Sequence, residues 1–307
     1  MIKAASRSQN YILKNRWWIY QKERFPIFKY GFLIAIFSGS AISYPNLLGD
    51  VTANFWGAWG VAFFVAFGCF LQMRIADEFK DYEDDCQYRP HRAVPRGLVT
   101  RYELGCLGIL IAVCQLLMVT FFQAKLVFYL CLIWGYFTLM CVEFGIRQWL
   151  KAHLSIYMLS HMVILPLIAL FCLACRSPIK NEYFLFCLTC FFNGIVIEIG
   201  RKIRAPQDEK VGVETYSSIW QPKTATLTWL LAIFLTAIAA ILSAGQINFV
   251  IPMAVILMPW ILLAAGISYW FIKTLNRKSA KWLDRMAGMW TVILYFSLGL
   301  LPFYLQF

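Results

Sequence analysis

Long apolar runs recur along the chain from about residue 28 to the C-terminus, and shorter polar segments separate them. Nine runs approach the length needed to cross a membrane, at 28–48, 55–76, 102–122, 126–146, 155–175, 183–200, 225–244, 250–272 and 287–305. A helix needs roughly 20 apolar residues to span a bilayer. Alternating strand patterns with turn residues are not visible, and backbone groups in lipid must bond within their own segment. The pattern therefore predicts an all-α bundle of nine transmembrane helices, forming one domain over residues 1–307.

Basic residues gather next to the apolar runs in a way that predicts the orientation of the chain. Nearly all of the 28 lysines and arginines lie at the N-terminus or after the second, fourth, sixth and eighth runs. The three exceptions are Lys125, Arg176 and Lys180. The positive-inside rule then places the N-terminal segment 1–27 and the loops 77–101 and 198–224 in the cytoplasm, and the C-terminus outside. We expect a multi-pass protein of the cytoplasmic membrane.

The overall composition supports membrane lipid as the surrounding medium. The chain is 61% hydrophobic and 14% charged, with mean hydropathy +0.64, which is unlike a soluble domain. Its net charge of +12 is spread between apolar runs rather than gathered in a basic domain, so we expect no nucleic-acid partner. The basic N-terminus lacks the apolar core and cleavage site of a signal peptide.

Ten cysteines include two pairs, C-L-A-C at 172–175 and C-L-T-C at 187–190, with spacing that also occurs in zinc sites. Both pairs lie inside apolar runs without a histidine nearby. We favour a packing role for these small side chains over a metal site in lipid.

The second apolar run ends in a strongly charged segment, RIADEFKDYEDDCQYRPHRAVPR at 74–96, which we call the first charged element. If the helix continues through it, Asp77, Asp81 and Asp85 lie about 40° apart on one face. Carboxylates in this spacing repel one another unless a cation lies between them. One interpretation is a solvated loop end whose acids pair with Lys80, Arg89 and Arg92. The other is a Mg²⁺ site in which carboxylates hold the metal and arginines bind a phosphate group.

A second charged segment, EIGRKIRAPQDEKVGVET at 198–215, follows the sixth run on the same predicted side, and we call it the second charged element. Its basic residues could instead anchor the helix at the lipid headgroups. The connection after the fourth run adds Arg147 and Lys151, and Glu143 is an intramembrane acid that we expect to face the bundle interior.

The two charged elements resemble those of the UbiA superfamily of intramembrane prenyltransferases. That family has nine transmembrane helices and two aspartate-rich motifs in cytoplasmic loops after the second and sixth helices. Its first motif, N-D-x-x-D-x-x-x-D with an arginine three residues before the Asn, is similar to R-I-A-D-E-F-K-D-Y-E-D-D at 74–85. Asp77 stands at the Asn position and Glu78 at the first Asp. The segment H-R-A-V-P-R-G at 91–97 is similar to the family's N-R-P-L-P-S-G.

The second motif departs from the family's D-x-x-x-D spacing. Arg204 stands at the first acidic position and Asp208 at the second, ahead of G-V-E-T at 212–215, and Glu198 could supply the missing acid. Lys151 fits the family's lysine after the fourth helix, while Arg147 falls at its tyrosine position.

The resemblance implies that Mg²⁺ held by both elements binds the diphosphate of an isoprenoid donor. The expected metal ligands, which are also the expected catalytic acids, are Asp77, Asp81, Asp85, Glu198 and Asp208. The expected diphosphate-binding residues are Arg74, Lys80, Arg92, Lys151, Arg201, Lys202 and Arg204. His161 could contact an acceptor, but a lone histidine on an apolar helix is more typical of packing.

Three functions remain open at this point. The first is transfer of a prenyl chain to a lipophilic, in particular aromatic, acceptor. The second is a terpene cyclase of the same superfamily, which uses no acceptor. The third is a divalent-ion transporter, which would place charged residues near the middle of several spans. The acids here gather at helix ends instead, so the sequence favours prenyl transfer.

Overall fold

The computed structural model describes residues 15–49, 51, 53–210 and 212–306, and its regular elements within these ranges are all helical. Nine helices in this part of the chain are long and apolar enough to cross a membrane, so the predicted fold class is confirmed. They are α3 (Ile27–Leu47), α4 (Phe55–Lys80), α6 (Arg101–Phe122), η1 with α7 (Ala124–Leu126, Val127–Cys141), α9 with α10 (Leu154–Met162, Ile164–Ala174), α11 (Tyr183–Arg201), α13 (Pro222–Gly245), α14 (Val250–Thr274) and α15 with η4 and α16 (Arg277–Tyr295, Phe296–Leu300, Leu301–Leu305).

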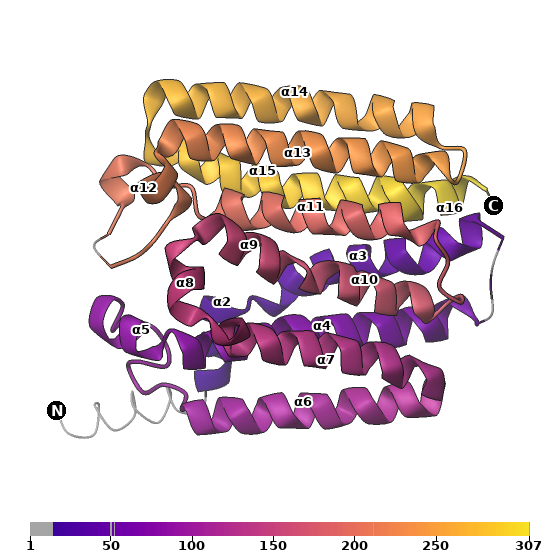
Figure 1. Cartoon of the computed structure of the whole chain (residues 1–307), viewed down its shortest axis with the longest axis horizontal. Coiled ribbons are helices and arrows are strands. Elements are labelled where there is room, and N and C mark those ends of the chain that lie inside the picture. The colour runs from indigo at the N-terminus through magenta and orange to yellow at the C-terminus, as the bar shows by residue number, and fades with distance from the viewer. Residues whose placement is uncertain (1–14, 50, 52, 211, 307) are drawn as a thin grey trace.

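Shorter helices gather at one end of the bundle, which we call the loop end (Figure 1). They are α2 (Arg16–Arg24), α5 (Tyr82–Tyr88), η2 (Glu143–Gly145), α8 (Arg147–Ala152), η3 (Pro206–Asp208) and α12 (Tyr216–Trp220). Because nine spans alternate in direction, the connections after α4, α7, α11 and α14 all lie at this end. Both charged elements therefore lie at the same end of the molecule.

Two boundaries differ from the apolar runs in the sequence. The ninth span begins at Arg277 rather than near residue 287, because its first turns are amphipathic. Asn276 caps it by accepting a hydrogen bond from the Ser279 N–H at 2.8 Å, and Ala280 and Leu283 are buried while charged neighbours face outward. The fourth span ends at Cys141 rather than 146, because Glu143 and Phe144 adopt positive φ values of 50° and 54°. A non-glycine residue in that region cannot continue a right-handed helix.

Close packing in the core fixes the position of the second charged element. Trp229 on α13 is fully buried, and its indole N–H donates to the Val196 carbonyl of α11 at 3.0 Å. A Cβ at Gly200 would come within 2.9 Å of both Trp229 and Ala287, so only glycine lets α11 approach α13 and α15 so closely. The last turn of α11 is therefore held rigidly at the loop end.

The outer surface of the bundle is apolar along its length. Large hydrophobic side chains on α6 and α14 face outward, among them Ile109, Phe121, Ile251, Val255 and Leu262. Extensive exposed apolar surface of this kind is typical of contact with lipid rather than water. The cysteines Cys172, Cys175 and Cys190 lie in the buried core among apolar side chains, as the packing interpretation expects.

Candidate active site

The first charged element begins on α4 and bends at Asp81. Helix α4 ends at Lys80 and α5 begins at Tyr82, and Asp81 between them has φ −96° and ψ 8°. Main-chain hydrogen bonds continue on both sides of the bend, from the Asp81 N–H to Asp77 and from the Asp85 N–H to Asp81. The sequence predicted that the three aspartates share one face of a continuous helix. The helix instead bends at Asp81, so the three side chains have different surroundings.

Asp85 is buried and neutralised by arginines. Its side chain is 1% exposed, Arg89 Nε lies 2.9 Å from one oxygen, and Arg92 donates to both oxygens at 2.6 and 2.9 Å. Glu78, which stands at the family's first Asp position, is also buried, and it forms an ion pair with Arg24 of α2. The sequence left two interpretations open, ion pairs with neighbouring bases or a Mg²⁺ site. Asp85 forms the ion pairs.

Asp77 and Asp81 remain less compensated than Asp85. The Asp77 side chain is 45% exposed and has one long ion pair, 3.4 Å to Arg74. Asp81 has no ion-pair partner among the residues that the structure describes. Burial raises the pKa of the Asp81 carboxyl, and the charges of Asp77 and Asp85 add to this rise. The pair leaves negative charge that a cation would stabilise.

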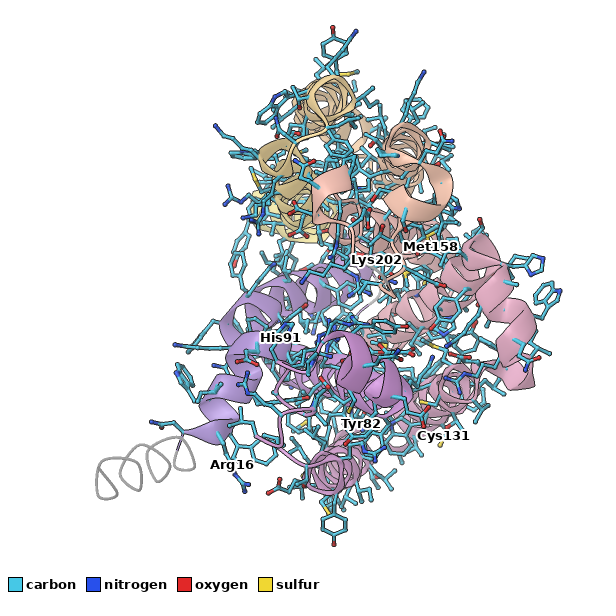
Figure 2. All side chains as sticks on the ribbon, turned by 90° about the vertical axis from the view of Figure 1, so that its left-hand side faces the viewer. Arg16, Tyr82, His91, Cys131, Met158 and Lys202 are labelled. Carbon is cyan, nitrogen blue, oxygen red and sulfur yellow. The ribbon has the colours of Figure 1, made fainter. Side chains whose placement is uncertain are left out.

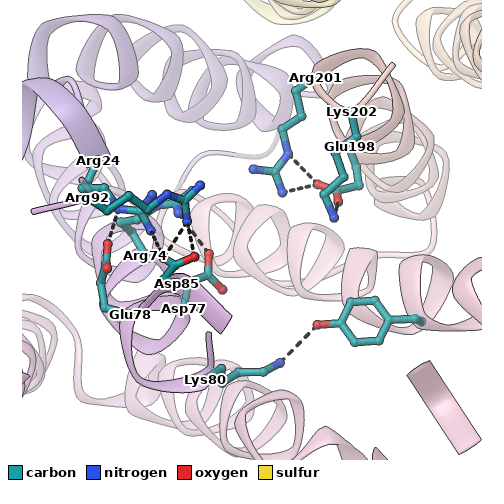
Figure 3. A network of polar contacts seen from close by, with 11 residues as sticks. Arg24, Arg74, Asp77, Glu78, Lys80, Asp85, Arg92, Glu198, Arg201 and Lys202 are labelled. Carbon is teal, nitrogen blue, oxygen red and sulfur yellow. Dashed lines mark hydrogen bonds and ion pairs between the residues drawn. The ribbon is translucent and has the colours of Figure 1, made fainter. Parts of the chain in front are cut away.

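Lys80 points away from these aspartates into a second network (Figure 3). Its ammonium lies 3.2 Å from Glu143 and donates to the Tyr157 hydroxyl at 3.2 Å and to the Met140 carbonyl at 3.4 Å. Glu143 is 3% exposed and faces the bundle interior as predicted, with Arg147 Nε at 3.3 Å from its other oxygen. Three acceptors thus hold Lys80, which the sequence predicted to bind diphosphate.

The second charged element faces the first from across the loop end. Figure 2 looks onto this end, with Tyr82 and His91 of the first element on one side and Lys202 on the other. Both oxygens of Glu198 are engaged by bases: Arg201 Nε donates to one at 2.7 Å, and Lys202 Nζ lies 2.9 Å from the other. Arg201 is also close enough to interact electrostatically with Asp77. Glu198, Arg201 and Lys202 thus lie together opposite Asp77 (Figure 3).

Three other predicted residues are not part of this cluster. Asp208, in η3, forms an ion pair of 3.6 Å with Arg277 of α15. Lys151 is exposed on α8 and has no ion pair or hydrogen bond from its side chain among the described residues. Arg204 donates its backbone N–H to the Ser217 hydroxyl at 2.8 Å, which fixes its main chain beside the cluster.

Several residues that shape the site were not identified from the sequence. Glu209 accepts hydrogen bonds from Thr215 at 2.7 and 2.8 Å and from Ser217 at 2.7 Å, which ties the loop after α11 together. Gly212, with φ 76°, leaves room for the Tyr88 ring of the first element, since a Cβ there would come within 2.4 Å of it. The two charged elements therefore touch. Only a three-dimensional structure reveals such long-range contacts.

His161 has the environment of a packing residue. It is buried, its ring stacks on Tyr157 at 4.0 Å between centroids, and its Nδ1 lies 2.8 Å from the Tyr157 carbonyl. Because a carbonyl oxygen can only accept, Nδ1 carries the proton. The arrangement agrees with the interpretation favoured from the sequence.

The carboxylates available to a divalent metal are few. Within the described ranges, no group of three or more His, Cys, Asp or Glu side chains lies close enough to form a complete protein site. Asp77 and Asp81 still fit Mg²⁺, which typically takes one or two carboxylates together with waters and substrate phosphates. The supporting observation is that Asp81 is partly buried and has no ion pair among the described residues.

Comparisons with known proteins agree with the fold and with the family resemblance. A model of the UbiA prenyltransferase family matches residues 32–292. Among solved structures, the chain is similar to digeranylgeranylglyceryl phosphate synthase, with a TM-score of 0.60 and 15% identity over 93% of this chain and 98% of the other. At that identity the likeness concerns the fold alone. Comparison with curated protein sequences gave no match. The match over most of its length shows that the chain belongs to the UbiA prenyltransferase family, a family of intramembrane enzymes.

Proposed function

We propose that this protein transfers a prenyl chain from a prenyl diphosphate to a second, lipophilic substrate, with Mg²⁺ as cofactor. The observation that carries the proposal is the cluster at the loop end, where Asp77 lies opposite Arg201 and Lys202 (Figure 3), one helical turn before Asp81. Carboxylates suit a divalent metal, and basic side chains suit a phosphate group. Both lie at the end of an apolar bundle, which suits the isoprenoid tail of such a donor.

In this reaction the bond between the first carbon of the prenyl chain and the diphosphate oxygen breaks, and the electron pair leaves with the diphosphate. The allylic carbon then bonds to the acceptor, which loses a proton. Arg74, Arg201 and Lys202 would stabilise the charge that grows on the diphosphate, which is usually the largest contribution to catalysis of this kind. Asp77 and Asp81 would hold Mg²⁺, which when bound supplies a Lewis acid to the phosphate oxygens.

The apolar tail would lie along α4 below the aspartates. A crevice between α4, α7 and α10 is lined by Cys69, Gln72, Met73, Ile133, Trp134, Phe137 and Ile164. Its free volume for a water-sized sphere is about 0 Å³, so its side chains would have to move apart to admit the tail. Gln72 and Met73 lie little more than one helical turn before Asp77, so the crevice begins next to the charged site. Aromatic rings in its wall would exclude water from a reacting allylic cation and stabilise its charge.

The acceptor and the orientation belong to the same proposal. An aromatic acceptor is one possibility, although the similar solved structure is named for a glyceryl phosphate. The basic residues around the loop end support its placement on the cytoplasmic side, with the N-terminus inside and the C-terminus outside. We treat the whole chain as a single domain of the cytoplasmic membrane.

The proposal is tested with purified protein in lipid nanodiscs, Mg²⁺ and prenyl diphosphates of several lengths. Without an acceptor we expect little release of diphosphate, and after addition of candidate quinone-precursor or glyceryl phosphate acceptors we expect a prenylated product by mass spectrometry. A cyclic hydrocarbon formed without any acceptor would instead show a cyclase. The absence of any turnover with every donor and acceptor would contradict both enzymes.

A further inference from the structure

We infer that a divalent metal binds only at the first charged element, and that Arg201 and Lys202 of the second element bind the diphosphate directly where a second metal would otherwise lie. The inference rests on the proposed function and deepens it. The acids of the second element are the reason, because the structure shows each of the three best-placed ones already engaged by the protein.

Glu198 lies in the cluster opposite Asp77 (Figure 3), and both of its oxygens are occupied. Arg201 contacts Oε2 with Nε at 2.7 Å and with a second guanidinium nitrogen, and Lys202 contacts Oε1 at 2.9 Å. One negative and two positive charges leave this group cationic. A divalent metal would have to displace two bases and then remain beside them, whereas a diphosphate would be attracted to the same two bases.

The other acids of the second element offer no replacement. Asp208 lies near Arg277, and Glu209 accepts three hydrogen bonds from Thr215 and Ser217 that hold the loop together. Glu214, the remaining acid of the element, is exposed. At the position where the family has its first aspartate, Arg204 adds a further positive charge.

In the first element the balance of charge is the opposite, because two of its acids have few basic partners. Asp81 has no ion pair within the described residues, Asp77 has one at 3.4 Å, and the positive charge of Lys80 is turned toward Glu143 and Tyr157. One metal held by Asp77, Asp81 and the diphosphate would neutralise this uncompensated negative charge. The opposite face of the diphosphate would then meet Arg201 and Lys202.

The test counts metal ions and does not need turnover. The full chain in nanodiscs is equilibrated by dialysis with Mn²⁺ and radiolabelled inorganic diphosphate, and both are counted per chain. We expect one Mn²⁺ and one diphosphate per chain. Asp81→Asn should weaken Mn²⁺ binding at least about tenfold, since a carboxylate ligand is lost. Glu198→Gln should leave the count at one, and Asp284→Asn, an exposed acid on α15, serves as the matched control.

Two Mn²⁺ per chain, or none, would overturn the inference. If Glu198→Gln does not fold, the number of Mn²⁺ ions per chain in Asp208→Asn and in the wild type still tests the inference. A two-metal site would show two ions in the wild type. Prenyl transfer accompanied by two bound metals would contradict this inference alone. A single bound metal without transfer to any acceptor would contradict the proposed function alone.

Discussion

The two charged elements lie at the same end of the bundle, but they neutralise their acids differently. In the second element, Glu198 pairs with the bases three and four residues after it on the same helix, which is the ordinary spacing for a helical ion pair. In the first, Asp77 is followed at three residues by Lys80, yet that lysine pairs with Glu143 instead. An acid followed at three residues by a base therefore has two close basic partners in the second element, but only one long ion pair, to Arg74, in the first.

The difference comes from the backbone after α7. The positive φ values at Glu143 and Phe144 end α7 early and turn the Glu143 carboxylate inward, where Lys80 meets it. Counting acids and bases in each element would miss this exchange of partners. A distant turn of the chain thus decides which acids keep a basic partner and which are left for the proposed metal.

Asp81→Asn should have the largest effect, because it removes a partly buried acid of the first element that has no ion pair among the described residues. We expect prenyl transfer to fall by about 10³-fold, since a catalytic metal contributes several kcal/mol of charge stabilisation and each 1.4 kcal/mol is tenfold in rate. Initial rates at saturating donor and Mg²⁺ measure the loss. Asp284→Asn should keep the wild-type rate, and an equally active Asp81→Asn would show that the first element does not hold the metal.

Arg201→Gln should reduce kcat/KM by about 10- to 100-fold, because one charge-assisted hydrogen bond to the diphosphate contributes roughly 1.5–3 kcal/mol. The variant also leaves Glu198 with Lys202 alone, which makes the second element resemble the first. Steady-state kinetics with varied prenyl diphosphate measure the change. Arg201→Lys should recover part of the loss, since it keeps the charge without the planar fork. If Arg201→Gln instead binds a second Mn²⁺ tightly, the comparison between the elements is sharpened further.

Glu143→Gln should make the first element resemble the second by releasing Lys80 toward Asp77 and Asp81. We expect Mg²⁺ affinity to fall by about tenfold, because a positive charge would then compete with the metal. The variant should also lower the thermal unfolding temperature, since breaking a buried ion pair costs about 3 kcal/mol or more. Mn²⁺ titration and thermal unfolding follow the two effects. Glu83→Gln, an exposed acid of α5, is the control, and unchanged metal affinity in Glu143→Gln would mean that Tyr157 and the Met140 carbonyl are enough to hold Lys80.

The smallest effect is expected on the stability of the metal-free protein. Because the folded-state pKa of Asp81 is raised, the folded chain binds its proton more tightly than the unfolded chain does. Ionised Asp81 therefore destabilises the folded chain. The loss of folding stability begins in the usual pKa range of an aspartate, grows as the pH rises, and is complete above the raised pKa of Asp81. In EDTA at neutral pH, Asp81→Asn should unfold at a slightly higher temperature than the wild type. The difference should vanish at low pH, and a wild type that remains more stable at neutral pH would contradict the assignment.

Much of the fold followed from the sequence because lipid imposes strict rules on it. Each of the nine spans had to be apolar where it crosses the hydrocarbon layer, and the described residues contain nine helices with such a stretch. The start of the ninth span was misplaced by about ten residues, because the charges of its amphipathic first turns conceal its buried face. An apolar run in the sequence predicts the part of a helix that lies in lipid, but not the part that packs against other helices at the loop end.

The candidate site was predicted in part, and the missing part depends on tertiary contacts. The spacing of Asp77, Asp81 and Asp85 indicated a shared charged surface, while Glu198 followed from its position at the end of α11. The partnership of Arg24 with Glu78 joins residues 54 apart, and no local pattern indicates it. The diversion of Lys80 to Glu143 likewise depends on two φ values that side-chain chemistry alone does not specify.

The early end of α7 also has a consequence for the surrounding bilayer. The span Ala124–Cys141 has 18 residues, whereas α14 has 25, so at 1.5 Å per residue they extend about 27 and 38 Å. Both carry outward apolar side chains, and they lie toward opposite edges of the bundle in Figure 1. A hydrocarbon layer of about 30 Å would have to thin beside one and let the other tilt. We therefore expect the bilayer to be thinner locally beside Ala124–Cys141, and the protein to tilt within a uniform membrane.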